Sequence, residues 1–184
     1  MFRPLPLVAS LTLAACSAIV PTTAARLASF DPLTADPAAI ELVVILPPGL
    51  AVSPGSARLE LFADRGDEHR SGSFRLADHA APGIVVPAGA TARGFVIAEA
   101  DVPRMRALQS EIAGWKATGE AKGSLGLGIG GCAVGTGPAP DATGSVLIRL
   151  REDGPLLPLV ADGRLADLLG PEVLAAIRPC QAAE

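Results

Sequence analysis

The sequence predicts a mainly β fold: an antiparallel β-sandwich, immunoglobulin-like or related, with one inserted amphipathic helix and a short helical C-terminus. Three observations favour this class. Short apolar runs alternate with polar residues at a period of two. Turn-forming residues separate these runs, and the 184 residues include 20 Gly and 17 Pro. The strands also lack the regular crossover helices that a parallel βαβ plan requires.

The strands of the first half are expected where β-branched or alternating runs end in turn residues. The earliest is the continuous apolar run at 40–46, which Pro47-Pro48-Gly49 closes. Four further strands are expected at 57–63, 73–77, 84–86 and 91–98. Their short length and spacing are typical of a sandwich or barrel.

The period then changes to that of a helix over residues 101–119. Asp101 is placed to cap this helix, Pro103 lies in its first turn, and Gly119 ends it. The apolar residues recur at i, i+3, i+7 and i+10: Met105, Leu108, Ile112 and Trp115. Such a stripe indicates core packing, so we expect this helix to cover one face or end of the sheet.

The second half returns to a period of two. Residues 125–129 alternate Leu or Ile with Gly. Val146, Ile148 and Leu150 similarly alternate with Ser145, Arg149 and Arg151, so both segments predict strands. Another strand is expected at 156–160. A short helix is then expected to open at Asp162 or Gly163 and to stop at Gly170-Pro171, with a last helical turn over 172–177.

Residues 1–15 have the layout of a secretory signal peptide. A positive charge at Arg3 precedes an apolar run over 5–13, and small residues follow. The run is shorter than the roughly 20 apolar residues that span a bilayer. We therefore expect cleavage rather than a retained transmembrane anchor.

The end of this segment, Leu13-Ala14-Ala15-Cys16, resembles the lipobox of bacterial lipoproteins. The resemblance implies that cleavage follows Ala15, that the Cys16 thiol receives a diacylglycerol, and that the new amino terminus is open to acylation. Ser17 stands where an inner-membrane retention signal usually has Asp, which implies the periplasmic face of the outer membrane. The resemblance covers these sixteen residues alone. The alternative is an ordinary signal peptide cut after Ala24-Ala25.

This interpretation divides the chain into three parts. Residues 1–15 are the signal peptide, residues 16–36 are the lipidated cysteine and a flexible tether, and residues 37–184 are a single β-rich domain. The expected location is the cell envelope, where the acyl chains attach the protein to the membrane.

Three cysteines are an odd number for an exported protein. Lipidation of Cys16 would leave Cys132 and Cys180 as one pair in an oxidising compartment, so we predict a disulfide between them. Two alternatives remain open: two buried free thiols, or Cys132 as a nucleophile. The second is disfavoured because both histidines lie more than 50 positions away in the sequence.

Nucleic acid is not an expected partner, because 15 Lys and Arg face 19 Asp and Glu, and only six aromatic residues are present. Residues 126–131 match G-x-G-x-x-G, but they lie in a strand pattern with no helix after it, so no nucleotide cofactor is expected. The glycines are expected to let another backbone or a side chain such as Trp115 approach the strand.

A group of acidic and histidine side chains around an expected hairpin raises the hypothesis of a divalent metal. Its members are Asp64, Asp67, Glu68, His69, Asp78 and His79. Their spacing matches no established site, and charged hairpin tips are usually solvated. We therefore predict no metal site and keep these six residues as weak candidates.

No catalytic residue set is expected, because the chain contains neither G-x-S-x-G nor S-x-x-K. The leading hypothesis is a lipid-anchored binding or assembly module whose partners are the membrane and another envelope protein. The alternative is a carrier that holds a lipid or other hydrophobic ligand under the helix at 105–115. A metal-binding protein or metal-dependent enzyme is the third hypothesis.

Overall fold

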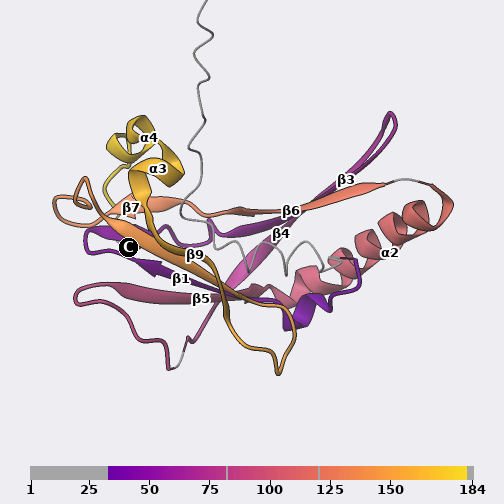
Figure 1. The fold of residues 1–184 in the computed structure, drawn as a ribbon, viewed down its shortest axis with the longest axis horizontal. Coiled ribbons are helices and arrows are strands. Elements are labelled where there is room, and N and C mark those ends of the chain that lie inside the picture. The colour runs from indigo at the N-terminus through magenta and orange to yellow at the C-terminus, as the bar shows by residue number, and fades with distance from the viewer. Residues whose placement is uncertain (1–32, 82, 120, 182–184) are drawn as a thin grey trace, which may run out of the picture.

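The computed structural model describes residues 33–81, 83–119 and 121–181 (Figure 1). Cys16 therefore lies outside the described residues. The elements in chain order are η1 (Pro37–Ala39), β1 (Glu41–Leu46), β2 (Leu50–Val52), β3 (Arg58–Arg65), β4 (Glu68–His79), β5 (Thr91–Ile97), η2 (Glu99–Asp101), α2 (Val102–Thr118), β6 (Lys122–Gly128), β7 (Gly131–Ala133), β8 (Thr143–Arg149), β9 (Leu157–Arg164), α3 (Leu165–Leu169) and α4 (Pro171–Ala175).

The predicted fold class is confirmed: the protein is mainly β and antiparallel, with one inserted helix and a short helical C-terminus. Seven strands form one curled sheet in the order β6-β3-β4-β5-β1-β8-β9, and β2 and β7 form a second sheet. Strand β4 joins the two halves of the large sheet. Its residues 68–75 pair with β3, and its residues 76–79 pair with β5.

Strand β1 lies between β5 and β8 and is buried along most of its length. Leu42, Val43 and Val44 are all nearly inaccessible, which explains why the sequence here is continuously apolar rather than alternating. One connected hydrophobic core extends from β1 to β3, β4, β5 and α2.

Helix α2 packs beside the half of the sheet that contains β3, β4 and β6 (Figure 1). Met105, Ile112 and Trp115 are buried and Leu108 is half-buried, so the predicted apolar stripe is core packing. Gly72 of β4 makes room for Leu108, because a Cβ there would lie 2.8 Å from Leu108 Cδ2.

The start of α2 differs from the prediction in one respect. Asp101 occupies the N-cap position, but its carboxylate makes no capping hydrogen bond. It accepts instead from the backbone N–H of Arg75 at 2.7 Å and from the Arg104 guanidinium at 2.9 Å. Asp101 thus ties the helix to β4.

One predicted strand and the predicted start of one helix are wrong. Residues 84–86 form no strand, and Val85 is 91% exposed. The prolines at positions 82 and 87 deprive this segment of two backbone donors. The short helix that was predicted to open at Asp162 or Gly163 starts later in the chain. Strand β9 continues through both residues, and Asp162 N–H donates to Ser145 Oγ at 2.9 Å. Helix α3 begins only at Leu165.

The last residues of the predicted tether pack against the domain. Leu33 is buried, and Ala35 accepts a hydrogen bond from Gln109 Nε2 at 3.0 Å. Asp36 pairs with Arg106 of α2 at 2.7 Å. The packed part of the chain therefore includes residues 33–36. No helix of the described residues is long and apolar enough to cross a membrane.

Candidate functional site

A groove of about 1020 Å³ lies between the C-terminal helices and the strand ends. Its walls come from β1, β2, β7, β8 and β9 on one side, and from α3, α4 and residues 176–181 on the other. Figure 1 shows α3 and α4 standing over β7 and β9 at one end of the molecule. Arg178 is the only charged side chain among the described residues that line this C-terminal groove.

The helical wall of the groove follows from the local sequence. Leu165 is buried and anchors α3 to the core. Gly170 adopts φ +84°, a left-handed conformation that ends α3, and Pro171 then starts α4. Leu168, Leu169 and Val173 remain 42%, 44% and 56% exposed beside the groove. Apolar side chains exposed together often mark a binding surface.

The cysteine pair forms part of the lining of this groove. The sulfurs of Cys132 and Cys180 lie 2.10 Å apart and their Cα atoms 4.8 Å apart, which is the geometry of the predicted disulfide. Two backbone hydrogen bonds with Ala133 hold the same segment: Ala133 N–H donates to Arg178 C=O at 2.8 Å, and Cys180 N–H donates to Ala133 C=O at 2.9 Å. The C-terminal segment is thus fixed to β7.

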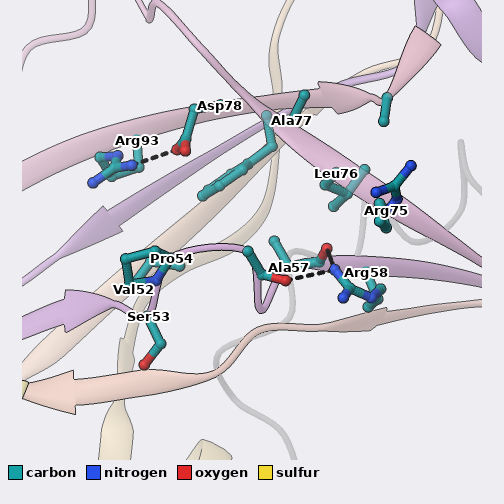
Figure 2. A pocket seen from close by; sticks show the side chains of 13 residues that line it. Val52, Ser53, Pro54, Ala57, Arg58, Arg75, Leu76, Ala77, Asp78 and Arg93 are labelled. Atoms are coloured by element: carbon teal, nitrogen blue, oxygen red, sulfur yellow. Dashed lines mark hydrogen bonds and ion pairs between the residues drawn. The ribbon is translucent and has the colours of Figure 1, made fainter. Parts of the chain in front are cut away.

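A second hollow, of about 330 Å³, has a different chemical character (Figure 2). Arginines from three strands line it, namely Arg58, Arg75 and Arg93. Arg93 pairs with Asp78, which also lines the hollow. Leu76 and Phe95 supply apolar surface. The segment at 52–54 lines both this arginine pocket and the C-terminal groove.

The six weak metal candidates do not come together. Asp64 Oδ1 lies 2.7 Å from His69 Nδ1, and Glu68 pairs with Arg65, all at the hairpin between β3 and β4. The other end of β4 carries Asp78 and His79, and nine residues of strand from His69 to Asp78 span about 30 Å. Within the described residues, no group of three His, Cys, Asp or Glu side chains could hold a metal ion.

The glycine motif at 126–131 is built into β6, the following loop and β7, with no helix after it. Gly130 does permit a close approach, because a Cβ there would lie 2.9 Å from Ser56 Cβ. Ser56 Oγ accepts from the Gly130 N–H at 3.1 Å. The approaching residue at Gly130 is therefore Ser56 and not the expected Trp115.

The face beneath α2 is packed by buried side chains. Met105 and Ile112 are fully buried there. The guanidinium groups of Arg65 and Arg70 each lie over the Trp115 ring, 4.7 Å from its centroid. The apolar hollow with the residues that could hold a hydrophobic ligand lies at α3 and α4.

The sequence reasoning missed both hollows. Leu165, Leu168 and Leu169 gave no signal for the groove, because their spacing of i, i+3 and i+4 is that of a helix packed on a core. Arg58 and Arg75 gave no signal, since they are 17 positions apart and meet only through the strand register. Comparison of the chain with protein-family models, with curated proteins and with solved structures found no match.

Proposed function

We propose that this protein is a lipid-anchored component of the cell envelope that acts by binding, and that the C-terminal groove takes a hydrophobic ligand such as an acyl chain. Cys16 would hold the domain on the periplasmic face of the outer membrane. The observation that carries the proposal is the apolar lining of the groove, in which Arg178 is the only charged side chain contributed by the described part of the chain.

The size and surroundings of the groove support this ligand class. Small-molecule pockets usually occupy about 300–1,000 Å³ and are mostly apolar, which matches the groove. Each methylene transferred from water into such a site contributes about 0.8 kcal/mol. Because Leu168, Leu169 and Val173 are exposed beside the groove, a ligand that covered them would also remove their apolar surface from water.

A second candidate function is assembly with another envelope protein. It is favoured by the same three side chains, because they are apolar and 42–56% exposed at the helical wall of the groove. A partner protein could cover these side chains without entering the groove. A carrier and an assembly module therefore differ in whether a small apolar molecule enters the groove.

The test uses the mature protein and a neutral apolar fluorophore, N-phenyl-1-naphthylamine. We expect saturable binding that Leu169→Glu weakens at least tenfold, because the new carboxylate places a charge in the apolar lining. Val85→Glu is the matched control. Val85 is 91% exposed and does not line the groove, so this variant should bind like the wild type.

Native mass spectrometry of the protein taken from its membrane completes the test. A bound lipid in the wild type that is lost in Leu169→Glu would support the carrier function. Absence of both a bound lipid and saturable dye binding would contradict it. If crosslinks from positions 168 and 173 then reached one defined envelope protein, the assembly function would be supported instead.

A further inference from the structure

Two arginines face each other across neighbouring strands at the edge of the arginine pocket. Arg58 of β3 and Arg75 of β4 are direct partners in the antiparallel register. Leu76 N–H donates to Ala57 C=O, so the adjacent pair, Arg58 and Arg75, occupies a non-hydrogen-bonded position. Side chains approach most closely at such positions, and like charges there repel each other.

Among the described carboxylates, Asp101 forms an ion pair with Arg75, and none forms one with Arg58. Arg58 Nη1 donates to the backbone carbonyls of Gly55 at 2.6 Å and Ala57 at 3.0 Å, which orients the guanidinium without compensating its charge. Among the described residues no carboxylate forms an ion pair with Arg58. Glu60 lies two residues further along the same face of β3, but it is not within ion-pair distance of either arginine.

Arg75 has a carboxylate nearby that is already engaged. Its Nε lies 3.5 Å from Asp101 Oδ2, beyond ordinary hydrogen-bond distance. That oxygen accepts from the Arg75 backbone N–H, while Asp101 Oδ1 accepts from Arg104. The Arg75 side chain is 61% exposed. Its guanidinium therefore remains open to a further anion.

The surroundings leave space for such an anion. The partner of Arg58 on β6 is Gly128, which adds no side chain beside the arginine. Figure 2 shows Arg58 and Arg75 on one side of the pocket, whereas the Arg93–Asp78 ion pair lies on the other side. The competing carboxylate of Asp78 is thus held away from the arginine pair by its own partner.

We propose that Arg58 and Arg75 together bind a phosphate group at the edge of this pocket. Each guanidinium presents a planar fork of donors that can engage two oxygens. A carboxylate, with two oxygens, satisfies one fork, whereas a tetrahedral phosphate offers oxygens to both. Binding would also remove the repulsion between two positive charges in a chain whose net charge is −4.

Titration calorimetry of the mature protein with inorganic phosphate, at constant ionic strength set with chloride, tests this site. We expect saturable binding that Arg58→Gln and Arg75→Gln each weaken at least tenfold. Arg151→Gln, an exposed arginine outside the pocket, should bind like the wild type. The same holds for Leu169→Glu, so failure of the groove proposal and failure of this one can be distinguished.

A second titration with glycerol 3-phosphate separates a free phosphate from a lipid head group. Equal binding of both anions indicates a site for free phosphate, and binding of the glycerol ester alone indicates a head-group site. The proposal is overturned if neither anion binds saturably, or if binding survives both Gln substitutions.

Discussion

Asp101 shows how one side chain connects three elements. Its carboxylate joins η2 to the backbone of β4 through Arg75 and to the first turn of α2 through Arg104. These two hydrogen bonds, with the backbone bond the larger cause, lower the pKa of Asp101 below the ordinary aspartate value of 3.8. The charged carboxylate therefore stabilises the folded state.

We expect Asp101→Asn to lower the free energy of unfolding by about 2 kcal/mol at pH 7, since hydrogen bonds to charged groups contribute about 1.5–3 kcal/mol. Because the folded pKa is lowered, the contribution is fully present above the unfolded pKa. It is lost as pH falls through the folded pKa. Urea unfolding at pH 7 and at pH 2.5 should therefore show a smaller difference between wild type and variant at the lower pH.

Asp67→Asn is the control for this experiment, because Asp67 lies exposed in the turn between β3 and β4. Its stability should match the wild type at both pH values. An Asp101→Asn variant as stable as the wild type at pH 7 would show that the carboxylate contributes nothing beyond its neutral isostere.

At the scale of elements, the disulfide holds the wall of the C-terminal groove. Cys132 and Cys180 are 48 positions apart, and closing a loop of that length restricts the unfolded chain by roughly 4 kcal/mol. We expect the double variant Cys132→Ser, Cys180→Ser to lose about that much stability. Hydrogen exchange should also rise in residues 165–181, which form the helical wall, and stay unchanged in α2.

Wild-type protein treated with a reductant is the matched comparison for that variant. It should show the same exchange pattern, because both treatments remove the same covalent link while the two backbone hydrogen bonds of Ala133 remain possible. Unchanged exchange in residues 165–181 would show that α3 and α4 are held by packing alone.

Elements were predictable from the sequence where local pattern and tertiary environment agree. Strand β1 is a continuous apolar run because both its faces are buried, and α2 shows its period because one side faces the core. The sequence predicts only residues 73–77 of strand β4. The first half of this strand, residues 68–73, is polar and mostly exposed, so it shows no alternating pattern. Its pairing with β3, not its side chains, keeps that half extended.

At the scale of the whole molecule, the candidate sites were not predictable because they arise from long-range placement. The C-terminal groove is lined by residues from seven helices and strands. No local sequence pattern in any of these elements indicates a groove. The arginine pair depends on a register that aligns Arg58 with Arg75. The cysteine pair was the exception, since lipidation of Cys16 would leave only one possible partner for each remaining cysteine.

The proposed lipid anchor would determine where the whole molecule is located. It is implied by the lipobox resemblance at residues 13–16. After residue 15 the chain has fourteen basic and nineteen acidic residues, so its charge gives no reason to bind an anionic membrane. Two or three acyl chains, at about 0.8 kcal/mol per buried methylene, would hold the protein on the membrane essentially without release.

The variant Cys16→Ser should therefore lack the mass of the diacylglycerol and should be absent from salt-washed membranes. Ser17→Asp, the matched control, should keep the lipid and move to the inner-membrane fraction. Membrane retention of Cys16→Ser with an unmodified mass would contradict the anchor.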